Sequence, residues 1–86
     1  MKRRSLWGAQ IRAARALLKW SAADLARHSS LGVNTIRRAE VATVETSLTA
    51  ANELAIYRAL ESAGVEFIDE NGGGPGVRLR KRQKQK

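Results

Sequence analysis

The feature that most constrains this fold is a helix start signal at Ser21, followed at once by a turn signal. Ser21 and Asp24 have the three-residue spacing of a capping box. This spacing predicts a short helix over residues 22–28. SSLG at residues 29–32 then favours a turn, because Ser side chains bond to the backbone and Gly accepts positive φ. Trp20 precedes the cap, so the helix also has the start of a hydrophobic staple with Leu25.

A second short helix is predicted from Val33 to about Glu40. Ile36 and Ala39 share one side of it and are expected to face the core. The polar side chains left outside are those of Asn34, Arg37 and Arg38. The segment over residues 21–40 therefore predicts two short helices that meet across a tight turn.

Further elements are predicted on both sides of this pair. An amphipathic helix begins at Leu6, and a longer one covers about residues 48–63 and ends at Gly64. Their expected core faces are Trp7, Ile11, Ala14, Leu17 and Leu18 in the first and Leu48, Ala51, Ala55, Ile56, Ala59, Leu60 and Ala63 in the second. VEFI at residues 65–68 and GVRLR at 76–80 flank a Gly-rich segment, which predicts a C-terminal β-hairpin.

Charge is unevenly distributed along the 86 residues, whose net charge is +8. Residues 1–38 carry nine basic residues and one acidic residue, whereas residues 39–76 carry one basic and seven acidic residues. Residues 77–86 carry six basic residues and no acidic residue. Such segregation indicates a basic surface for a polyanion, and nucleic acid is the leading candidate.

Residues 21–40 resemble the helix-turn-helix of the phage repressor and Cro-like family, and the resemblance extends over about residues 10–60. Ala26 is small where the two helices would cross. Arg15 and Glu40 match the arginine and glutamate that pair in this family, which implies a structural ion pair. The sequence departs from the family at Ser30, where glycine is common, and at Ala22, where glutamine is common. A strand also replaces the family's fifth helix.

The resemblance implies a mainly α, four-helix, lambda-repressor-like helix-turn-helix domain with a short C-terminal β-hairpin or strand. We expect a basic N-terminal arm at 1–5, the helix-turn-helix domain at 6–64, a β element at 65–80 and a basic disordered tail at 81–86. The second helix of the motif would enter the major groove of DNA.

The same resemblance implies residue roles. The expected base contacts are Val33, Asn34, Thr35, Arg37 and Arg38. The expected phosphate contacts are Ser21, Ala22, Ala23, Arg27 and Thr43, of which the two alanines would use backbone N–H groups.

The predicted function is sequence-specific binding of double-stranded DNA by a transcriptional regulator, with repression as the expected mode. A homodimer is expected because such modules commonly read two half-sites. Its expected contacts are Leu54, Tyr57, Val65, Phe67 and Ile68, where strand pairing would hide an exposed edge. One alternative is an antitoxin or accessory factor whose main task is to bind a partner protein. Another is a non-specific RNA or nucleoid binder that uses the basic ends.

Composition excludes several other classes. The chain has no cysteine and one histidine, so thiolate chemistry and a structural zinc site are not expected, nor are any cofactor or catalytic residues. His28 is expected to be a solvated helix-end residue. No apolar run approaches the roughly 20 residues of a membrane span, so a cytoplasmic protein is expected.

Overall fold

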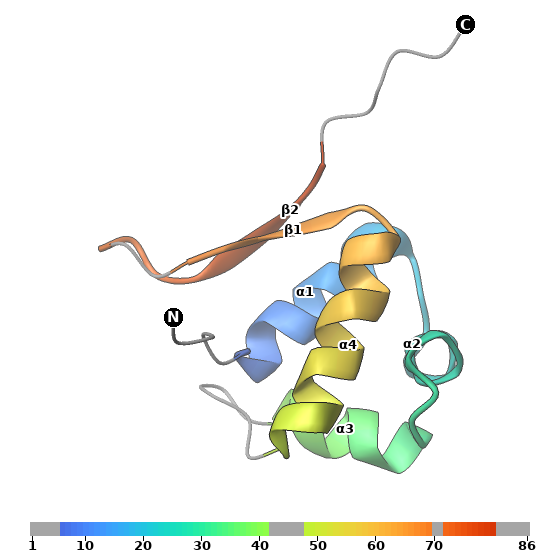
Figure 1. Cartoon of the computed structure of the whole chain (residues 1–86). Coiled ribbons are helices and arrows are strands. Elements are labelled where there is room, and N and C mark those ends of the chain that lie inside the picture. The colour runs from blue at the N-terminus through green and yellow to red at the C-terminus, as the bar shows by residue number, and fades with distance from the viewer. Residues whose placement is uncertain (1–5, 42–47, 70–71, 81–86) are drawn as a thin grey trace, which may run out of the picture.

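The computed structural model describes residues 6–41, 48–69 and 72–80. In these residues, helices α1 (Gly8–Leu18), α2 (Ala22–Ser29), α3 (Val33–Val41) and α4 (Ala50–Ser62) precede strands β1 (Val65–Ile68) and β2 (Gly76–Leu79) (Figure 1). The prediction of a mainly helical fold with a C-terminal β-hairpin is confirmed. None of the helices in these three ranges combines the length and apolar character that a membrane crossing requires.

The boundaries of α2 follow from local interactions. The Asp24 N–H donates to Ser21 Oγ at 3.0 Å, and the Ser21 N–H donates to Asp24 Oδ2 at 2.9 Å, so the predicted capping box is present. The helix ends at Ser30, which adopts a left-handed conformation with φ 63° and ψ 31°. Ser30 therefore takes the backbone conformation for which glycine is the favoured residue.

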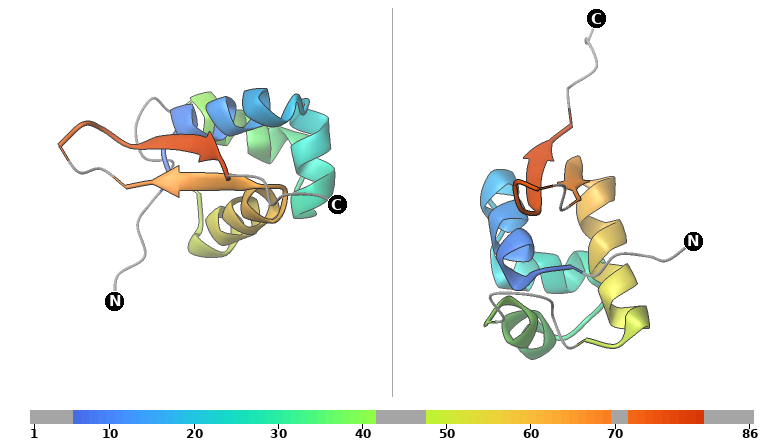
Figure 2. Two further views of the ribbon diagram at one scale, coloured as in Figure 1. Left: turned by 90° about the horizontal axis from the view of Figure 1, so that it is seen from above. Right: turned by 90° about the vertical axis from the view of Figure 1, so that its left-hand side faces the viewer.

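The elements pack in layers around α1 (Figure 1, Figure 2). Helix α3 packs against α1 and α2, and α2 also packs against α4. The hairpin lies across α1 and α4, on the side of the molecule away from α3. Its strands pair antiparallel, with Val65 opposite Leu79 and Phe67 opposite Val77. Helix α3 therefore forms one end of the molecule and the hairpin forms the opposite end.

The core differs from the prediction at both ends of α1. The helix begins at Gly8 rather than at Leu6, yet Leu6 is 1% exposed and belongs to the core. Leu17, predicted to be buried, is 40% exposed. The inward stripe runs through Ile11 and Ala14 toward Leu18, and Leu17 lies about 100° around the helix from Leu18.

Helix α4 also turns a different face inward. Its buried residues are Glu53, Ile56 and Leu60, at i, i+3 and i+7, so the predicted core residue Ala51 is exposed. The Glu53 carboxylate is buried because its Oε2 accepts a hydrogen bond from the Leu6 N–H at 2.8 Å. This bond joins the entry to α1 with the first turn of α4.

Gln10 is the second buried polar residue that links distant parts of the chain. Its Oε1 accepts from the Trp7 N–H at 3.0 Å, and its Nε2 donates to the Gly76 carbonyl at 3.1 Å. One amide therefore caps the start of α1 and attaches β2 to it. Since a buried amide without partners is costly, these bonds explain why glutamine is tolerated there.

Candidate nucleic-acid interface

An ion pair between α1 and α3 sets the position of the helix-turn-helix. Arg15 Nε donates to Glu40 Oε2 at 2.6 Å, and Arg15 Nη2 donates to Glu40 Oε1 at 2.8 Å. The side chains are only 23% and 9% exposed, respectively. The side-chain hydrogen bond to Glu40 raises the pKa of the Arg15 guanidinium above its ordinary value. The predicted ion pair is therefore present as a two-point, largely buried contact.

The same guanidinium reaches a third element. Arg15 Nη1 donates to the Trp20 carbonyl at 2.9 Å, in the turn that leads into α2. Arg12 Nη1 donates to the Glu40 carbonyl in the last turn of α3. Arg15 thus holds both the entry to α2 and the end of α3, with Arg12 as a second contact to α3. No role was predicted for Arg12, although its position one turn before Arg15 could have suggested a contact to α3.

Helix α3 turns a polar face away from the protein. Asn34, Arg37 and Arg38 are exposed, while Ile36 and Ala39 are buried, as predicted. Neither Arg37 nor Arg38 forms an ion pair with any residue in the described part of the chain. By contrast, Arg15, Arg27 and Arg78 each pair with a carboxylate. The exposed face of α3 therefore offers two cations and an amide to a binding partner.

The other two predicted base contacts lie at the edges of this face. Val33 is half-buried and packs against the core, so only part of its side chain is accessible. Thr35 is also half-buried and lines a groove between α3 and the start of α4. The exposed face of α3 is thus centred on Asn34, Arg37 and Arg38 rather than on all five predicted residues.

The start of α2 carries most of the predicted phosphate contacts. Ser21 and Ala23 are exposed and Ala22 is half-buried. Arg27 Nη2 pairs with Asp24 Oδ1 at 3.0 Å, but its side chain is 69% exposed. Such an exposed pair contributes little stability, so Arg27 can exchange Asp24 for another anion at little cost. Thr43, the fifth predicted phosphate contact, lies outside the described residues.

Asp24 changes the electrostatics of this helix start. The hydrogen bond from the Ser21 backbone N–H, followed by that from Arg27, lowers the pKa of Asp24 below its ordinary value of 3.8. The residue is therefore ionised at neutral pH. A carboxylate here balances the positive end of the helix dipole and would repel a phosphate unless Arg27 remained nearby.

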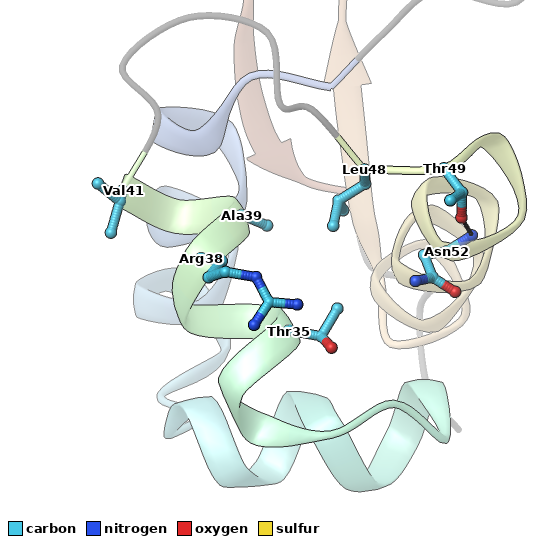
Figure 3. Close-up of a pocket in the computed structure, with 7 residues that line it drawn as sticks. All are labelled: Thr35, Arg38, Ala39, Val41, Leu48, Thr49 and Asn52. Atoms are coloured by element: carbon cyan, nitrogen blue, oxygen red, sulfur yellow. Dashed lines mark hydrogen bonds between the residues drawn. The ribbon is translucent and has the colours of Figure 1, made fainter.

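A groove of about 390 Å³ adjoins the face of α3 (Figure 3). Figure 3 shows the Arg38 guanidinium and Thr35 from α3 on one side and Thr49 and Asn52 from α4 on the other. Thr49 Oγ1 caps α4 by accepting from the Asn52 N–H at 3.1 Å. Neither Thr49 nor Asn52 was predicted to belong to the interface. The sequence signal that could have indicated them is a Thr three residues before an amide, placed after the helix predicted to enter the major groove.

The predicted dimer contacts divide into two groups. In the first group, Leu54, Tyr57, Phe67 and Ile68 are each half-buried. The rings of Tyr57 and Phe67 are in contact, with centroids 4.9 Å apart. Val65 is 0% exposed, so its side chain is not available to a second subunit, and only the strand edge is left for the predicted contact. The side chain is buried because Val65 lies on the hairpin face that covers α1 and α4, where it completes the protein's own core.

The remaining candidate groups have structural explanations. His28 is exposed and stacks on Trp20, with ring centroids 4.2 Å apart and planes 8° from parallel. Among residues 6–41, 48–69 and 72–80, no group of three or more His, Cys, Asp or Glu side chains could hold a metal ion. Neither the models of known protein families nor the curated proteins provide a match to this sequence.

Proposed function

We propose that this protein binds double-stranded DNA in a sequence-specific manner through α3 and acts as a transcriptional regulator, with repression as the expected mode. The observation that carries the proposal is the exposed face of α3, where Arg37 and Arg38 pair with no carboxylate of the described residues and Asn34 lies beside them. Helix α3 also forms one end of the molecule, which leaves this face open to a duplex (Figure 1).

The chemistry of this face suits the major groove. Arginine forms two hydrogen bonds with the O6 and N7 atoms of guanine, and asparagine does the same with the N6 and N7 atoms of adenine. Arg38 and Asn34 are the residues that we assign to these roles. Arg37 can reach either a base or a phosphate. The Arg15–Glu40 pair holds α3 against α1, so the helix backbone itself loses little conformational freedom on binding.

Backbone phosphates would be bound on both sides of α3. On one side, the N–H groups of Ala22 and Ala23 open α2, and Arg27 lies one turn later. On the other side, the groove with Thr49 and Asn52 opens beside Arg38 (Figure 3). Contacts of this kind set the register of the protein on DNA, whereas the bases contacted by α3 set the sequence preference.

A homodimer is part of this proposal. Leu54, Tyr57, Phe67 and Ile68 lie on α4 and β1, so a second subunit bound there would leave α3 uncovered. Selection of binding sites from a random duplex library tests this directly. A dimer would select two inverted half-sites about 10 base pairs apart, whereas a monomer would select one.

The role of α3 is tested on the selected duplex. Arg38→Ala should weaken binding by about 1–3 kcal/mol and relax the preference at one base pair. Arg78→Ala, which removes an exposed arginine from β2, is the matched control and should leave that preference unchanged. Equal weakening on all sequences would make Arg38 a phosphate contact, and no weakening by Arg38→Ala or Asn34→Ala would refute the proposed interface.

A further inference from the structure

The outer edge of strand β2 is open. The Arg80 N–H donates to the Gly64 carbonyl at 2.7 Å, which fixes the positions in the hairpin that are hydrogen-bonded across the two strands. Because such positions alternate in an antiparallel pair, the backbone N–H and C=O groups of Val77 and Leu79 point away from β1. These groups have no hydrogen-bond partner among the described residues. An edge of this kind can pair with a further strand.

Two hollows lie along this edge, between β2 and α1. The hairpin places β2 on the side of α1 and β1 on the side of α4 (Figure 2). The first hollow, of about 390 Å³, is lined by Ala9 and Ala13 from α1 and by Val77. The second, of about 370 Å³, is lined by Leu17 from α1 and by Leu79. Four helical residues rise about 6 Å and two strand residues about 7 Å, so the hollows have the spacing of alternate residues in an extended peptide.

The second hollow has apolar walls that the protein itself leaves uncovered. Leu17 and Leu79 are 40% and 48% exposed, and they are two of the three large hydrophobic residues exposed in the described ranges. Leu79 is opposite the buried Val65 in the hairpin, so its side chain is on the face that covers the helices. An apolar side chain that entered this hollow would cover both leucines, and burial of apolar surface drives association.

The charge of the edge favours an acidic partner. Helix α1 and strand β2 contain no acidic residue. Arg78 lies between the two open positions, on the other face of the strand, and is 68% exposed. Its Nε pairs with Glu66 at 2.7 Å, which leaves the terminal N–H groups of the guanidinium for a second carboxylate.

The same arginine disfavours a second copy of this chain as the occupant. Antiparallel pairing of two β2 strands through the open groups of Val77 and Leu79 would place Val77 of one copy opposite Leu79 of the other. Arg78 would then be directly opposite Arg78, and like charges in that position are destabilising. An acidic strand has the opposite effect.

We propose that this groove, formed by the two hollows and the open edge of β2, binds an extended segment of a partner protein in which two apolar residues flank an Asp or Glu. The segment adds to the hairpin as a third strand, with its backbone paired to Val77 and Leu79. Its apolar side chains enter the hollows and its carboxylate meets Arg78. The proposal goes beyond DNA binding and does not rest on it. The hairpin lies opposite α3, so a peptide here leaves α3 uncovered (Figure 1).

The experiment selects a peptide and then locates it. The full chain is immobilised and used to enrich a phage-displayed library of random linear peptides, and one enriched peptide is synthesised. We expect the enriched peptides to share an apolar residue, an acidic residue and a second apolar residue in succession. Replacing the acidic residue of the synthetic peptide by its amide should weaken binding by up to about fivefold.

Amide hydrogen exchange measured by NMR locates the bound peptide. At a peptide concentration of about 100 times its Kd, exchange of the Val77 and Leu79 amides should slow by up to about 100-fold. Phe67 is the control within the chain, because it is opposite Val77 and its amide points to the outer edge of β1. Its exchange should not change.

Two variants test the groove. Leu17→Glu should weaken peptide binding by about tenfold or more, because it places a carboxylate in the apolar hollow. Ala16→Glu is the matched control: Ala16 is the exposed neighbour of Leu17 and lines neither hollow, so this variant should bind within about twofold of wild type. Leu79→Pro removes an N–H from the open edge only and should also weaken binding, which gives a second test if Leu17→Glu is unstable in thermal unfolding.

Five results would overturn the proposal. They are the absence of any enriched peptide, apolar residues at helical spacing in the enriched peptides, protection of Phe67 in place of Val77 and Leu79, equal weakening by the two glutamate variants, and protection of the β2 amides without peptide. Protection that rises with protein concentration would make a second copy the occupant, and protection by a DNA duplex would make it nucleic acid. Failure of the proposed function is separate, because Arg38→Ala should leave peptide binding unchanged.

Discussion

Replacing Arg15 by Met should destabilise the whole domain, because it leaves the largely buried Glu40 carboxylate without its partner. Removal of one member of a buried ion pair costs about 3–5 kcal/mol. Because Arg15 is partly exposed, we expect a cost near the lower end of this range of about 3–5 kcal/mol. Loss of the hydrogen bond to the Trp20 carbonyl adds about 1 kcal/mol. We therefore expect a loss of about 3–4 kcal/mol. This is a large part of the roughly 4–13 kcal/mol of stability usual for 86 residues.

Urea and thermal unfolding followed by circular dichroism would measure this loss. A change of this size lowers the Tm by more than about 12 °C in a domain of this length. Arg78→Met is the control within the chain, since Arg78 pairs with Glu66 at 2.7 Å but is 68% exposed. An exposed pair contributes about 0–1 kcal/mol, so that variant should unfold nearly as wild type does.

A double variant separates the unpaired charge from the lost packing. Arg15→Met together with Glu40→Met removes both charges, so the double variant should be more stable than Arg15→Met alone. If Arg15→Met unfolded within about 2 °C of wild type, the pair would not fix α3 as we infer. If the double variant were the less stable one, the cost would come from lost hydrogen bonds and packing rather than from the stranded carboxylate.

Three further predictions concern local features. Ser30→Gly should raise the free energy of unfolding by up to about 1 kcal/mol, because Ser30 has a positive φ that glycine adopts without strain. Ser62→Gly, in the helical conformation of α4, should lower it by up to about 1 kcal/mol. Equal losses for the two variants in urea unfolding would show that the positive φ of Ser30 carries no cost. Leu6→Ala should lower the free energy of unfolding by about 2–5 kcal/mol, because Leu6 is buried, whereas Leu17→Ala should lower it by less than about 1 kcal/mol. If the two variants lowered the Tm by similar amounts, Leu6 would not belong to the core. Because the pKa of Asp24 is lowered, its carboxylate stabilises the fold at pH values above 3.8, and this contribution disappears as the pH falls through the lowered pKa. The difference in unfolding free energy between wild type and Asp24→Asn should therefore be full at pH 7 and vanish in strong acid, and a difference that does not change with pH would contradict this.

Much of the local architecture could be predicted because it depends on neighbours in sequence. The capping box at Ser21, the left-handed residue at Ser30 and the glycine with φ 111° at Gly64 are each decided within one helical turn. The hairpin was predictable for the same reason, since a Gly-rich segment separates two short strands. The outward face of α3 followed from the spacing of Ile36 and Ala39.

The partners of several side chains could not be predicted, because they come from distant parts of the chain. The buried Glu53 carboxylate accepts a hydrogen bond from the Leu6 N–H, which is 47 residues away in sequence. Arg12 bonds to α3 only because α1 packs against the end of that helix. Hydrophobic periodicity predicts neither of these two hydrogen bonds, because it describes one helix at a time and not the element packed against it.

The sequence by itself therefore determined the order of the helices and strands and the start of α2, because capping, turn and strand signals act over a few residues. The Arg15–Glu40 pair, expected from the sequence, is present in the structure. Only the tertiary structure decided that Val65 is buried within the chain's own core and that the hairpin lies opposite α3. The burial of Val65 and the position of the hairpin depend on which apolar faces pack against each other. This pairing of faces depends on the close packing of elements that are distant in sequence.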